Sequence, residues 1–207
     1  MKKTLGLIAA VAVMTILAAP AEADTITFAG LQNGESILNF YNGGLGGSGS
    51  GPGPNLGVIF SPNAIVTGGA GGDPRLFFTP LGPVIANVPG GFVSQLSFLA
   101  SSGTPFPSVT VTAFEGLNGT GNLLGQVSMI QTGIGTSLQP FSFTFGGTAR
   151  SIVFAGLPGF ATFDTITFTP AAAAVPEPTT MLLLGTGLAG VAAKVRKRRK
   201  VTQSETA

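Results

Sequence analysis

Residues 141–145 read FSFTF, a strict alternation of phenylalanine with a small hydroxyl residue. Successive side chains of a β-strand point to opposite faces, so this stretch presents three aromatic rings to one face and two hydroxyls to the other. The pattern predicts a strand of an antiparallel sheet that has one buried face and one wet face.

Short runs of the same texture, rich in Thr, Val, Ile and Phe, recur on both sides of this strand and are separated by glycine-rich turns. The 207-residue chain has 32 glycines, and its 16 phenylalanines all lie within residues 24–174. This predicts an all-β fold, a glycine-rich β-sandwich. The expected strands are 25–28, 37–41, 57–60, 64–67, 75–78, 92–99, 109–115, 123–130, 141–145, 150–154 and 162–168.

Two loops have distinctive sequences. Asn118-Gly119 lies between two expected strands and predicts a hairpin turn with positive φ. Residues 43–54, GGLGGSGSGPGP, offer few side chains for packing, so we expect a flexible surface loop there.

Charge is concentrated at the two ends of the chain. Residues 24–174 hold five acids, two arginines and no lysine, and this excludes a basic, nucleic-acid-binding body. The chain has no His and no Cys, which excludes Ser-His-Asp and Cys-His catalytic sites, the usual zinc sites and disulfides. We therefore expect a body that is not an enzyme.

The N-terminus has the organisation of a secretory signal peptide. Lys2 and Lys3 precede an apolar run over residues 5–17, and Ala21 and Ala23 form a small-x-small cleavage site. The run is shorter than the roughly 20 residues of a membrane span. We expect signal peptidase to remove residues 1–23.

The C-terminus carries a second hydrophobic segment, residues 179–193, which predicts a short transmembrane helix. It follows Pro176, Glu177 and Pro178. Basic residues directly after such a segment stay in the cytoplasm, so an exported chain would stop there. The segment is shorter than a permanent span of about 20 residues, which favours a temporary anchor over the alternative of a permanent one. The cytoplasmic basic cluster comprises Lys194, Arg196, Lys197, Arg198, Arg199 and Lys200.

In this order, residues 175–200 resemble the PEP-CTERM sorting signal of Gram-negative bacteria. The resemblance implies that Pro176, Glu177 and Pro178 are recognised by exosortase, a membrane protease-transpeptidase, and that the tail is removed. It implies transient anchoring in the inner membrane, followed by transfer to the outer surface or extracellular matrix. Family members are typically made by bacteria that export polysaccharide, so exopolysaccharide or biofilm is the implied surrounding. Four segments are expected: signal peptide 1–23, exported domain 24–174, sorting signal 175–200 and tail 201–207.

Residues 109–168 also resemble, loosely, the jelly-roll bodies often attached to this signal. The resemblance rests on Val109-Thr110-Val111-Thr112, on residues 151–154 and on the closing segment 163–168. In such bodies the closing strand often reads Phe-Asp-Asp-Ile, and Thr165 stands here in place of the second aspartate. The resemblance implies a jelly-roll-like body.

Carboxylates leave two further possibilities open. Asp24, Asp73 and Asp164 could hold calcium together with backbone carbonyls, which would suit a calcium-dependent, lectin-like carbohydrate-binding module. Otherwise we expect no cofactor. Two carboxylates, such as Glu115 and Asp164, could instead serve a glycoside hydrolase.

Uncharged polar residues suggest two kinds of contact. Thr25-Ile26-Thr27, Thr110-Val111-Thr112 and Thr165-Ile166-Thr167 each place two threonines on one strand face, which could bind ice or could be ordinary polar strand faces. Some ice-binding proteins carry the same C-terminal signal. The body has no Trp, so glycan contact would use Tyr41, Asn or backbone groups. A surface of Ser, Thr, Asn and Gly suits contact with hydrated polymer.

Overall fold

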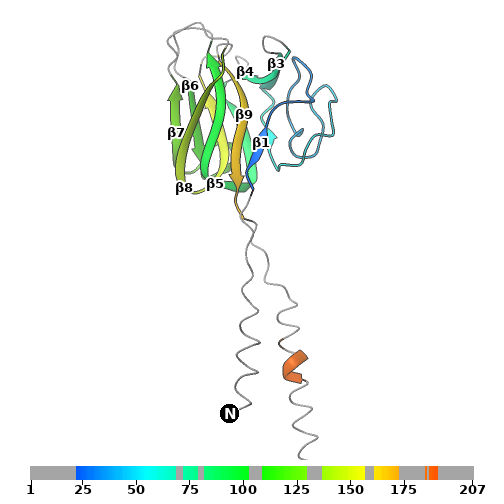
Figure 1. Cartoon of the computed structure of the whole chain (residues 1–207), viewed down its shortest axis with the longest axis vertical. Coiled ribbons are helices and arrows are strands. Elements are labelled where there is room, and N and C mark those ends of the chain that lie inside the picture. Colours follow the sequence, from blue (N-terminus) through cyan, green and yellow to red (C-terminus); the bar gives the residue numbers. More distant parts are fainter. Residues whose placement is uncertain are drawn as a thin grey trace, which may run out of the picture. The chain divides into compact units, whose positions relative to one another are not determined.

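The computed structural model describes residues 22–68, 72–78, 82–102, 109–129, 137–156, 161–172, 185 and 187–190. This part of the chain is nearly all β, which confirms the predicted all-β class (Figure 1). A single turn of 3₁₀-helix, η1 (Leu117–Gly119), joins two of the strands. The strands are β1 (Asp24–Ile26), β2 (Ile59–Phe60), β3 (Ala64–Gly68), β4 (Pro74–Phe78), β5 (Val84–Ser102), β6 (Val109–Phe114), β7 (Leu123–Met129), β8 (Gln139–Ala155) and β9 (Ala161–Pro170).

All of these strands belong to one hydrogen-bonded antiparallel sheet. Its order is β3-β4-β9-β5-β8-β6-β7, and β1 and β2 pair additionally with β9 and β5. Neighbours in the sheet are mostly distant in sequence, so the fold depends on long-range pairing.

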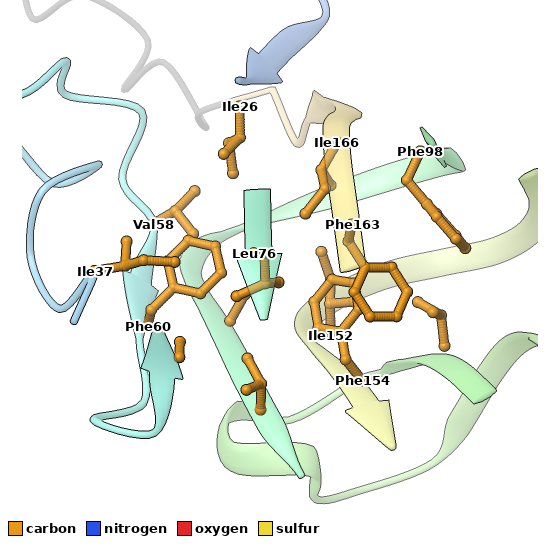
Figure 2. Close-up of a cluster of buried hydrophobic side chains, with 14 of the residues drawn as sticks. Ile26, Ile37, Val58, Phe60, Leu76, Phe98, Ile152, Phe154, Phe163 and Ile166 are labelled. Carbon is orange, nitrogen blue, oxygen red and sulfur yellow. The ribbon is translucent and has the colours of Figure 1, made fainter. Parts of the chain in front are cut away.

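The sheet folds over on itself into two layers. The rings of Phe154 and Phe163 lie 4.9 Å apart between centroids (Figure 2). Their partners on β5 are Val84 and Ala100, which would lie about 50 Å apart on a straight strand. β5 therefore bends back, and its register with β8 shifts between Asn87 and Phe92.

The core lies between these two layers and is dominated by phenylalanine. Phe28, Phe92 and Phe168 are fully buried, and the last two meet edge to face at 5.7 Å. In residues 141–145 the three Phe rings pack partly buried against this core, whereas Ser142 and Thr144 are exposed. The alternation predicted for this stretch is confirmed.

Several strand expectations differ from the structure. Residues 37–41 form turns, because the Phe40 N–H bonds to the Ile37 carbonyl and Leu38 has φ of 50°. The expected strands 141–145 and 150–154 are parts of the single long strand β8. β5 begins at Val84, earlier than the expected start. Gly146 and Gly147 lie within β8 and do not end the strand.

The glycine-rich stretch 43–54 is built around Glu35, so the expectation of a flexible loop is wrong. Glu35 is 1% exposed, and its Oε1 accepts hydrogen bonds from the N–H groups of Ser48 and Ser50 at 2.7 and 3.1 Å. Its Oε2 accepts bonds from the Gln32 N–H and the Ser50 hydroxyl at 2.8 and 2.6 Å. The buried carboxylate of Glu35 therefore fixes the conformation of this loop through its hydrogen bonds to Ser48 and Ser50.

The chain divides into two compact units, Met1–Ala171 and Ala172–Ala207. In the second unit, Gly185 and residues 187–190 are helical and exposed. Among the described residues, no helix combines the length and apolar character of a membrane span.

Several predicted site residues lie outside the described residues. They are Ala21 of the cleavage site, the triplet Pro176, Glu177 and Pro178, and the basic cluster from Lys194 to Lys200. Ala23 is described, and it is exposed directly before β1.

Candidate functional site

Asp164 lies in β9 and is 7% exposed, and its Oδ1 accepts a 2.7 Å bond from the Thr165 N–H. Burial raises the pKa of Asp164 above its usual range, and the charge of Asp73 adds to this. The Thr165 N–H and the charge of Arg75 act in the opposite direction. Asp164 is therefore a carboxyl in an unfavourable setting for its charge.

The other two predicted calcium ligands do not complete a cage around Asp164. The Asp73 Oδ2 lies 3.8 Å from the Arg75 Nε, so its charge is already offset. Asp24 begins β1 opposite Phe168, four positions along β9 from Asp164. The described ranges contain no group of three acids that could hold a metal ion. Asp24, Asp73 and Asp164 are thus not brought into one site.

Glu115, the other acid considered for hydrolysis, is exposed and belongs to a turn. Its Oε2 accepts a 2.8 Å bond from the Asn122 side-chain amide, which closes the loop between β6 and β7. Glu115 follows β6, which is not a neighbour of β9 in the sheet.

The same loop shows which polar residues the sequence pattern missed. Asn118 and Gly119 have φ of 57° and 69°, as predicted for the turn. Ser151, which is fully buried in β8, donates to the Gly116 carbonyl at 2.6 Å and accepts from the Gly119 N–H at 3.0 Å. Nothing in the local sequence around Ser151 marks this role, because its partners come from another hairpin.

Tyr41 is not available for glycan contact. It is 3% exposed, and its ring packs edge to face against Phe28 and Phe40 at 6.0 and 5.2 Å. Burial raises the pKa of its hydroxyl, and the charge of Asp164 adds to the shift. Tyr41 is a core residue.

Two of the three predicted threonine pairs come together. Thr25 of β1 lies opposite Thr167 of β9, and their hydroxyls are 3.0 Å apart. The third pair lies in β6, and its Thr112 is buried. Thr165 has φ of 48°, which interrupts the regular strand geometry beside Thr167. The described threonines therefore form a small group and not a repeating array.

A row of hydroxyls crosses the outer face of four strands. Ser142 of β8 pairs with Ser97 of β5, Ser97 pairs with Thr167 of β9, and Thr167 pairs with Thr25 of β1. We call these four residues the hydroxyl row. Three of its members, Ser97, Ser142 and Thr167, line an open groove of about 450 Å³. Other lining residues include Gln95, Leu99 and Pro140. The row could not be found from sequence, because its members come from four separate segments.

The comparison with protein families concerns the C-terminus. Residues 174–199 match the family model described as the PEP-CTERM protein-sorting motif. The chain carries a PEP-CTERM signal. The predicted resemblance is confirmed, and the match includes the triplet Pro176, Glu177 and Pro178. A PEP-CTERM motif implies processing by an exosortase, with export and transient anchoring in the membrane.

Three solved structures show distant similarity to this chain. CsCBM6-3 from Clostridium stercorarium, solved in complex with cellobiose, is 18% identical, covers 54% of this chain and 85% of its own, and has a TM-score of 0.38. The K2 cleaved adhesin domain of Lys-gingipain is 11% identical. The match covers 72% of this chain and 99% of that domain, with a TM-score of 0.48. A variant of the family 29 carbohydrate-binding module CBM29-2 is 12% identical. The match covers 76% of this chain and 99% of that module, with a TM-score of 0.43. No curated protein matches the chain.

Proposed function

We propose that this is an exported, non-catalytic protein of the bacterial surface or extracellular matrix. Signal peptidase removes residues 1–23, and the PEP-CTERM signal then holds the chain in the inner membrane through a short transmembrane helix. Exosortase recognises Pro176, Glu177 and Pro178, cuts the tail away, and transfers the jelly-roll-like domain 24–174 outward. The match of residues 174–199 to the PEP-CTERM motif is the observation that supports this most directly.

The composition of the body supports association with exopolysaccharide. Residues 24–174 contain only five acids and two arginines, so the body has little charge to attract or repel a charged partner. Its sheet presents exposed hydroxyls, such as Ser142, beside buried phenylalanines. Such a surface exchanges hydrogen bonds with hydrated polymer and needs no metal ion for contact.

Cell fractionation of a sorting variant tests this proposal. Pro176→Ala combined with Pro178→Ala removes both prolines of the Pro-Glu-Pro triplet and leaves the hydrophobic segment and the basic cluster intact. We expect the wild-type protein in the surface and matrix fractions and this variant in the inner membrane. Thr202→Ala, in the tail beyond the signal, is the matched control and should fractionate as wild type. Equal fractionation of wild type and the proline variant would refute exosortase sorting.

A further inference from the structure

The groove beside the hydroxyl row has the chemistry of a ligand site. We propose that it binds a strand of uncharged polysaccharide. The inference rests on the proposed function, because export is what brings the body into contact with such polymer. It names the surface that makes the contact and the class of polymer.

The hydroxyl row supplies hydrogen-bonding groups in a fixed geometry. Neighbouring strands of a sheet are about 4.8 Å apart, so Ser142, Ser97 and Thr167 offer the groove a hydroxyl at each such step across three strands. The bond between Thr25 and Thr167 uses one donor and one acceptor of that pair. Each hydroxyl has one donor and two acceptor positions, so Thr167, which lines the groove, keeps further positions for a ligand.

The groove also has an apolar side. Leu99 of β5 lies opposite Pro140 of β8, two positions along from Ser97 and Ser142 and therefore on the same outer face. A pyranose ring has a C–H face and a hydroxyl edge. Leu99 and Pro140 pack against the C–H face while the hydroxyl row and Gln95 bond to the edge, the usual division of roles in a small-molecule site.

The lining decides the class of polymer. None of the described residues that line the groove is charged. A polyuronate or sulfated chain would find no cationic side chain in the groove to pair with its charges, whereas an uncharged chain needs no such partner. Retention of an uncharged chain in the groove should therefore be insensitive to salt.

Frontal affinity chromatography of the full chain in mild detergent tests the proposal. The columns carry hydroxyethyl cellulose, dextran or galactomannan as uncharged probes and alginate as the charged one, at about 1 M NaCl, where the Debye length is only about 3 Å. The high salt suppresses binding through the basic cluster at the C-terminus. Because the full chain is used, the measured retention does not depend on whether exosortase removes the tail in cells.

Three variants separate the groove from the fold. Ser97→Ala with Ser142→Ala removes two hydroxyls of the row, and Ser97→Thr with Ser142→Thr keeps them. The control is Gln126→Ala with Ser128→Ala, because both residues are exposed on β7, away from the groove. Melting temperatures of all variants establish that each one is folded.

We expect retention on at least one uncharged column and weaker retention on alginate. The alanine variant should bind about tenfold more weakly, the effect of losing one or two hydrogen bonds, while the threonine variant and the control bind as wild type. Equal binding of all variants, or retention on alginate alone, would overturn the groove assignment. Either result leaves the fractionation test of sorting untouched, so the two proposals fail separately.

Discussion

The Ser50 hydroxyl donates a 2.6 Å hydrogen bond to the Oε2 atom of Glu35, in a pocket where both residues are buried. With three backbone N–H groups on the same carboxylate, this bond organises the glycine-rich stretch 43–54. A buried charge without a partner is costly, whereas a carboxylate that accepts several bonds is stable in its charged form.

The first prediction concerns the replacement of Glu35. Glu35→Gln places an amide N–H₂ where N–H groups already point inward, so at least one donor loses its acceptor. We expect the free energy of unfolding to fall by about 2–4 kcal/mol, measured by urea denaturation at neutral pH. Glu115→Gln, at an exposed turn, is the matched control and should cost less than about 1 kcal/mol. Equal losses for the two variants would show that the Glu35 bonds do not support the fold.

The second prediction is an acid dependence of stability. Burial raises the pKa of Glu35, but its hydrogen bonds outweigh burial and lower the pKa from 4.5 to about 2. A lowered pKa means that the folded protein holds the charged form more strongly than the unfolded chain does. The contribution of Glu35 is complete above pH 4.5 and is lost as the pH falls towards 2. Melting curves should show wild type losing more stability than Glu35→Gln in this range, and parallel curves would contradict the assignment.

The third prediction has the opposite sign. Burial and the charge of Asp73 raise the pKa of Asp164, so its charged form opposes folding at neutral pH. Asp164→Asn keeps an oxygen for the Thr165 N–H and removes the charge. We expect its melting temperature at pH 7 to equal or exceed that of wild type, with calcium addition causing no rise in either protein. A large loss of stability would show that the charged carboxylate stabilises the fold, and a calcium-dependent rise in wild type alone would show that it binds calcium; either result would contradict the prediction.

The fourth prediction concerns Gly46, which lies against the buried acid. A Cβ added at Gly46 would lie 2.5 Å from the Glu35 Oε1 and 2.8 Å from a methyl carbon of Leu31. Gly46→Ala should therefore lower the free energy of unfolding by about 1–3 kcal/mol. Gly90→Ala, which meets nothing within 4 Å, is the control and should be nearly neutral. If both variants unfold alike, the stretch 43–54 is not packed against Glu35.

Local patterns predicted most of the strands, and they could not predict their arrangement. The alternation in residues 141–145 identified part of β8 because side-chain orientation depends only on neighbours in sequence. The contact between Phe154 and Phe163 depends on the bend of β5, which joins segments far apart in the chain. The glycine-rich stretch 43–54 misled for a related reason, since its organising side chain, Glu35, lies outside it.

The functional features also divide into those that a local pattern predicts and those that depend on strand pairing. The PEP-CTERM signal is linear, so Pro176, Glu177 and Pro178 were recognisable from their order with the segments after them. The hydroxyl row is not linear, because Thr25 and Thr167 meet only when β1 pairs with β9. The predicted grouping of Asp24, Asp73 and Asp164 lacked any such pairing information.

The central claim is that the chain is exported and cut at its PEP-CTERM signal, and intact mass spectrometry tests it most directly. The protein would be recovered from the envelope and from the medium of host cells with and without exosortase. We predict a wild-type mass that begins at Asp24 and ends near Pro176 to Pro178, and a longer species in cells without exosortase. A wild-type mass that still includes the basic cluster from Lys194 to Lys200 would contradict the account.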